Sequence, residues 1–141
     1  MFRIKNIVLI AVFLLSVGVF AYLVPFRPVL IQRTLIMVET AKTPQQRSCG
    51  LQGRSVLAAN GGMLFFFNEE GFPQFWMKDT FIPLDIAFID AGKKILDIQE
   101  MVPLQTDIRY YPSAKAKYAL EMNAGWFKKN NIHVGHKMFF W

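Results

Sequence analysis

The chain has 141 residues, of which 53% are hydrophobic and 18% charged, a composition too apolar for a disordered protein and a length typical of one domain. Its formal net charge is +6 at pH 7, but the part from Thr34 onward carries 12 basic and 10 acidic residues. Because these basic residues are not clustered with exposed aromatic ones, the sequence argues against a nucleic-acid-binding protein.

An apolar segment near the N-terminus is the first predicted element. The 18 residues from Ile7 to Val24 carry no charge, and as a helix they would cover about 27 Å of a hydrocarbon layer of about 30 Å. Arg3 and Lys5 precede the segment, which favours an N-terminus in the cytoplasm. We expect residues 1–25 to form a membrane anchor that holds the domain outside the cytoplasm, in the periplasm or extracellularly. The alternative is a signal peptide cleaved near Ala21, which would leave a secreted domain.

Residues 26–33 are expected to be a linker and residues 34–141 the domain. An extended segment rich in Leu, Ile and Val predicts a first strand over Leu30–Glu39. A short helix follows from Pro44 to about Leu51, because Thr43 can cap it and a glutamine stands three residues after that cap.

Short apolar runs predict the remaining strands, at Met63–Phe67, Pro83–Asp90, Lys93–Met101, Lys117–Met122 and within Ile132–Trp141. A second short helix is predicted to follow Asn123 as its cap, to run through Trp126-Phe127-Lys128-Lys129 and to end near Asn130-Asn131. Seven or eight short strands with two short helices indicate a mainly β domain, either a β-sandwich or a barrel.

The segment Trp76-Met77-Lys78-Asp79-Thr80, followed by Ile82-Pro83-Leu84-Asp85, resembles a motif of the uncharacterised DUF192 family, also called UPF0127. Further matches are Gly62-Met63-Leu64-Phe65, Glu100-Met101-Val102-Pro103-Leu104 and Glu121-Met122-Asn123-Ala124-Gly125-Trp126-Phe127. The resemblance implies a compact, jelly-roll-like β fold that is often secreted or membrane-tethered. It implies no reaction and no catalytic residues.

Asp85 is the first candidate for chemistry, since it lies within an apolar strand. Alternation places Leu84, Ile86 and Phe88 on one face and Asp85, Ala87 and Ile89 on the other. A carboxylate in that position needs hydrogen-bond donors or a cation, or its pKa rises. We expect Lys78 and the backbone of the Lys78-Asp79-Thr80 turn to be its partners. The role is either structural or that of an acid in a cleft.

Glu100 and Glu121 each stand near the end of a predicted strand. If those ends meet around Asp85, three carboxylates would surround one cleft and could act as general acid and base. The alternative is that the three acids are separate and face solvent or cap turns.

Four residues of the shared motif are candidates for ligand binding, namely Trp76, Lys78, Asp79 and Thr80. An exposed Trp76 could stack on a ligand, although a core or rim position is the other interpretation. Cys49 is the only cysteine, so an internal disulfide is excluded, and we expect it to be a small buried residue on a helix. His133 and His136 are three residues apart and do not form a metal pair on one strand, so neither a metal nor a cofactor is expected.

Three functions are compatible with these features. The first hypothesis is a non-enzymatic module of the cell envelope that binds a small molecule, a glycan or a protein partner at the Trp76/Lys78/Asp79 edge. The alternative is a hydrolase that acts on a polar or carbohydrate envelope substrate with Asp85, Glu100 or Glu121 as acid and base. The third is that the motif only specifies the fold.

Overall fold

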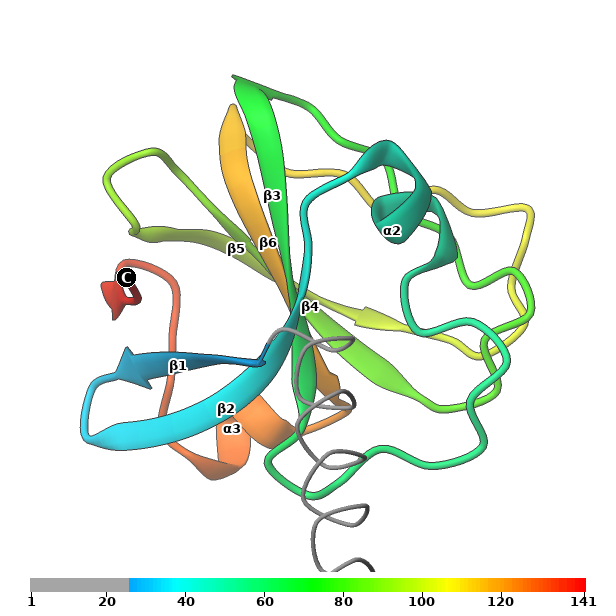
Figure 1. The fold of residues 1–141 in the computed structure, drawn as a ribbon, viewed down its shortest axis with the longest axis horizontal. Coiled ribbons are helices and arrows are strands. Elements are labelled where there is room, and N and C mark those ends of the chain that lie inside the picture. Colours follow the sequence, from blue (N-terminus) through cyan, green and yellow to red (C-terminus); the bar gives the residue numbers. More distant parts are fainter. Residues whose placement is uncertain (1–25) are drawn as a thin grey trace, which may run out of the picture.

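The computed structural model describes residues 26–141 (Figure 1). The expected anchor or signal segment over residues 1–25 lies outside the described residues. The described elements are β1 (Phe26–Ile31), β2 (Thr34–Ala41), α2 (Pro44–Cys49), β3 (Gly62–Gly71), β4 (Leu84–Ile89), β5 (Ile95–Met101), β6 (Ala116–Asn123), α3 (Trp126–Lys129) and β7 (Met138–Phe139). Among residues 26–141, no helix combines the length and the apolar character needed to cross a membrane.

The seven strands form one sheet in the order β5-β4-β6-β3-β2-β1-β7, which curls into a half-barrel (Figure 1). All pairings are antiparallel except that of β2 with β3, which α2 connects. A bridge between Lys94 and Lys137 also brings the segment before β7 next to the start of β5. The predictions of a mainly β domain and of two short helices are confirmed. The sandwich alternative is wrong, because the strands form a single curled sheet.

The predicted first strand is in fact a hairpin. The chain turns at Gln32 and Arg33, between β1 and β2, and Gln32 adopts a positive φ of 54°. Residues 26–31, expected to be part of a linker, therefore form β1 and pair with β2. The apolar side chains Val29 and Val38 face the core from the two strands. A turn without Gly, Asn or Pro carries no ordinary turn signal, so the sequence did not reveal it.

The core has two parts, one on each face of the curled sheet. On β4 the side chains of Leu84, Ile86 and Phe88 contribute to one buried cluster, and Ala87 and Ile89 to the other. This confirms the predicted alternation. The helix α3 packs its Trp126 and Phe127 into the second of these clusters, so that α3 closes that face of the sheet.

The two helices differ in how their first turns are capped. The capping box predicted for α2 is present, since Thr43 Oγ1 accepts a hydrogen bond from the Gln46 backbone N–H and the Gln46 side chain accepts one from the Thr43 N–H. Asn123 does not cap α3, because it still belongs to β6; its Nδ2 instead donates to the Ala58 carbonyl at 2.9 Å. Gly125, with a φ of 79°, occupies the N-cap position without a side-chain cap.

Candidate functional site

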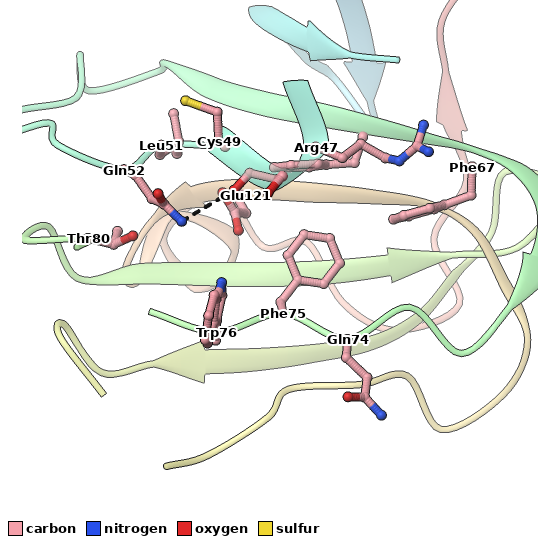
Figure 2. A pocket seen from close by; sticks show the side chains of 13 residues that line it. Arg47, Cys49, Leu51, Gln52, Phe67, Gln74, Phe75, Trp76, Thr80 and Glu121 are labelled. Atoms are coloured by element: carbon pink, nitrogen blue, oxygen red, sulfur yellow. Dashed lines mark hydrogen bonds between the residues drawn. The ribbon is translucent and has the colours of Figure 1, made fainter. Parts of the chain in front are cut away.

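A pocket of about 240 Å³ lies between α2 and the segment that follows β3, above the buried face of the sheet (Figure 2). Its aromatic side chains are Phe65 and Phe67 from β3, then Phe75 and Trp76. The Phe75 ring stands edge-on to Phe65, with centroids 5.0 Å apart, and to Phe67 at 6.2 Å. The Phe75 backbone forms a two-hydrogen-bond bridge with Tyr110, which holds this wall of the pocket in place.

Among the described residues, Glu121 is the one carboxylate that lines this pocket. It is opposite Met63 of β3 and Ile86 of β4, and its side chain therefore shares the face that carries these buried residues. The residue is only 5% exposed. Within residues 26–141 no hydrogen bond or ion pair engages its carboxyl group.

Burial governs the ionisation of this carboxyl group. Loss of hydration raises the pKa of Glu121 to about 8, because burial disfavours the charged form. Every fully enclosed side-chain nitrogen or oxygen in the described part of the chain has a partner. The unpartnered Glu121 oxygens must therefore retain access to the pocket. Near pH 7 the group is a neutral acid that can donate one hydrogen bond and accept others.

The opposite side of the pocket is polar and comes from α2 and the turn after it. The Arg47 Nη1 atom donates to the Phe66 carbonyl at 3.0 Å and also to the Lys42 carbonyl. Its guanidinium carbon lies 5.6 Å from the centroid of Phe67. Figure 2 shows this guanidinium directed toward Phe67 and away from Glu121. Arg47 is thus a fixed rim residue and does not neutralise the buried acid.

Cys49 ends α2 and borders the same pocket, where it is exposed. The prediction that it lies on a helix is confirmed, but the prediction that it is buried is wrong. The reason is that α2 has no buried residue at all. The helix lies on the surface and contributes only its pocket-facing side.

Two of the four expected ligand-binding residues line the pocket. Trp76 is 40% exposed, and its ring centroid lies 4.5 Å from the Arg109 guanidinium carbon and 5.4 Å from Lys78 Nζ. Thr80 is buried at the pocket wall, and its hydroxyl donates to the Lys78 carbonyl at 3.1 Å. Lys78 and Asp79 are exposed and do not line the pocket. Asp79 forms the tip of the turn, with a φ of 52°.

Asp85 and Glu100 lie away from this pocket. They are direct neighbours across β4 and β5. The Asp85 carboxylate accepts a hydrogen bond from the Gly125 N–H at 2.8 Å, so the expectation that it bonds to Lys78 and its turn is wrong. Burial raises the pKa of Asp85, the Gly125 hydrogen bond opposes that shift, and the negative charge of Glu100 adds to it.

The three carboxylates do not surround one cleft. Glu121 pairs with Ile86, the residue next to Asp85, so their side chains lie on opposite faces of the sheet. Asp85 and Glu100 do come together, and Glu121 stands alone in the pocket. In the described part of the chain no group of three His, Cys, Asp or Glu side chains could hold a metal ion.

The sequence interpretation missed the aromatic wall and the contribution of α2. The apolar run Met63–Phe67 by itself predicts only a buried strand. Period-two alternation within it places Phe65 and Phe67 on one face, a signal that could have identified them as a pair. Arg47 gave no signal, because its position depends on how α2 lies over the sheet.

Comparison with known proteins identifies the family. The model of the DUF192 family, described as Uncharacterized ACR, matches residues 29–140. The chain belongs to the DUF192 family. No curated protein matches it.

Two solved structures are similar to this DUF192 chain. One is a protein from Sinorhizobium meliloti 1021 described as a candidate transcription regulator, with 31% identity, a TM-score of 0.79, and coverage of 83% of this chain and 95% of that one. The other is a protein of unknown function from Novosphingobium aromaticivorans DSM 12444, with 29% identity, a TM-score of 0.77, and coverage of 82% and 85%. Both share the fold of this chain.

Proposed function

We propose that this DUF192 domain is a non-enzymatic binding module that takes a small ligand into the Glu121 pocket. The observation that carries the proposal is a buried carboxyl group that has no partner within residues 26–141, in a pocket with aromatic walls. A buried polar group that lacks a partner costs stability. A ligand that supplies the missing hydrogen bond or charge would recover that cost on binding.

The pocket argues against the hydrolase alternative. Glycoside hydrolysis uses two carboxyl groups about 5–10 Å apart on either side of the bond that breaks. In the part of the chain that the structure describes, only one carboxylate, Glu121, lines this pocket. The pair formed by Asp85 and Glu100 is on the other face, where Asp85 is buried and bonded to Gly125. A hydrolase would have to use this second pair, with Glu100 as its exposed member.

The location of the module is also a proposal. An uncharged segment of 18 residues precedes the domain, and we propose that it tethers the domain to the outer side of the membrane or is cleaved on export. The name of the Sinorhizobium relative does not carry over, because the 12 basic and 10 acidic residues from Thr34 onward are nearly balanced. Protease added to intact spheroplasts should digest the domain, and digestion only after lysis would contradict the proposed location.

A metabolite screen that follows the thermal unfolding of the chain tests the binding function. A ligand of the folded state raises the midpoint by mass action, without knowledge of any reaction. A hit should be weakened by Phe75→Leu and Glu121→Gln, which alter the pocket, and unaffected by Glu69→Gln, which changes an exposed carboxylate on β3. Hits that ignore the two pocket variants would contradict the proposal. Turnover of a hit that depends on Asp85 and Glu100 would favour the hydrolase.

A further inference from the structure

The Glu121 pocket has the features of a site for a small organic cation. We infer that its ligand carries a protonated amine or quaternary ammonium group, which pairs with the Glu121 carboxylate against the aromatic rings. This inference rests on the proposed binding function and names its ligand class. Among the described residues that line the pocket there is one carboxyl group, without a partner, and one cationic side chain, and the inference follows from their placement and from the aromatic walls.

The charge balance inside the pocket favours a cation. The titratable groups that line it are Arg47, Cys49 and Glu121. Arg47 is held at the rim by two backbone carbonyls, and no hydrogen bond or ion pair joins it to Glu121. Strands β3 and β4, which pack on both sides of β6, place only apolar Met63 and Ile86 opposite the carboxyl group. An entering ammonium group would therefore meet an acid with no other partner.

Ionisation of the acid is a small obstacle to such a ligand. A cation binds the ionised carboxylate, so Glu121 must first release its proton. Since its pKa is about 8, this requirement lowers the affinity by only about tenfold at pH 7. In exchange, the cation forms an ion pair in a site where water screens charges weakly. The same pairing gives no advantage to a neutral ligand.

The aromatic walls of the pocket also attract a cation. A cation within about 6 Å of an aromatic ring centroid is attracted by the ring's π face. The chain already uses this contact around the pocket, since Arg109 and Lys78 lie 4.5 and 5.4 Å from the Trp76 centroid. The rings of Phe65 and Phe75 also line the cavity. The cavity volume is about 240 Å³. Pockets for drug-sized ligands are larger, roughly 300–1,000 Å³. It suits a compact headgroup.

Proton linkage separates a cation from the other ligand classes. A cation binds the ionised form of Glu121, so its affinity rises with pH until the acid is fully ionised. A carboxylate or polyol that accepts a hydrogen bond from the neutral acid shows the opposite trend. The direction of the pH dependence therefore identifies the class of ligand.

The test is an NMR titration of the full-length chain with methylammonium and tetramethylammonium chloride, against sodium chloride at equal ionic strength, tert-butanol and sodium acetate. We expect at least one ammonium ion to shift the Glu121 and Phe75 amide signals, with a dissociation constant that falls about tenfold from pH 6 to pH 7. Glu121→Gln should weaken this binding at least tenfold at pH 8, and Glu69→Gln should leave it unchanged. Phe75→Leu, which retains the acid, should weaken tetramethylammonium more than tert-butanol.

Each other result has a definite meaning. Ammonium ions that bind no better than sodium or tert-butanol would overturn the inference. Acetate or tert-butanol that binds at the pocket and is lost in Glu121→Gln would overturn the cation class while the binding module stands. If the metabolite screen also yields no ligand that depends on Phe75 and Glu121, both the inference and the proposed function fail.

Discussion

Replacing Glu121 with glutamine is expected to stabilise the fold at neutral pH. In the folded chain burial raises the pKa of this carboxyl group from 4.5 to about 8. At pH 7 the unfolded chain has released this proton and the folded chain retains it. The unfolded-state pKa of 4.5 lies about 2.5 pH units below pH 7, and this interval corresponds to roughly 3 kcal/mol against folding. Glutamine has nearly the same shape and no proton to release, so the variant should regain that amount.

Because folding raises the pKa of Glu121, the free energy of unfolding should depend on pH in a distinct way. A folded-state pKa above the unfolded value contributes full stability below pH 4.5, and the contribution is lost as the pH rises toward 8. Urea unfolding at pH 5, 6, 7 and 8, followed by tryptophan fluorescence, measures this profile. The wild-type free energy of unfolding should fall by roughly 3–4 kcal/mol across that range relative to Glu121→Gln. The raised pKa of Asp85 acts in the same direction but is common to both proteins, so it cancels in the difference.

The control for this experiment is Glu69→Gln, which removes an exposed carboxylate from β3. Its profile should run parallel to that of the wild type. If the Glu121→Gln and wild-type profiles also run parallel, or if the variant is less stable at pH 7, then Glu121 is not a buried neutral acid and the reasoning is refuted.

Three further substitutions test local contacts that stabilise the fold. Gly62→Ala should lower the free energy of unfolding by roughly 2 kcal/mol or more, since the new Cβ would stand 2.4 Å from the Glu121 carbonyl oxygen. The control is Gly71→Ala on the same strand, where a new Cβ would have no atom within 4 Å, and it should change the free energy little. Equal effects of the two variants would contradict the clash. Asp85→Ala should cost about 1–3 kcal/mol in urea unfolding because the Gly125 N–H loses its acceptor, and a variant as stable as the wild type would sink a structural role for Asp85. Thr43→Ala should cost about 1 kcal/mol by removing the cap of α2, measured by the shift in thermal midpoint; no shift would mean that the capping box is not stabilising.

The sequence was a reliable guide wherever local chemistry decides the structure. The cap at Thr43, the strands predicted at Pro83–Asp90 and Lys93–Met101, and the alternation around Asp85 all follow from side chains a few residues apart, and all are confirmed. The turn at Gln32 was missed because its residues have no turn preference. Asn123 does not act as a cap because its pairing with Leu84 of β4 holds it in a strand, and propensity yields to tertiary contacts.

In the candidate site, too, some features follow from local sequence and others from tertiary contacts. The sequence alone marked Trp76, Thr80 and Glu121, through the family motif and their chemistry, and it determined that the domain would be a small β fold. Only the tertiary structure decided that Glu121 is separated from Asp85 by the thickness of the sheet, because their faces depend on the register of β6 against β4. The aromatic wall and Arg47 likewise meet Glu121 through contacts between segments distant in the chain. Burial, and with it the raised pKa, arises from those contacts and from no local pattern.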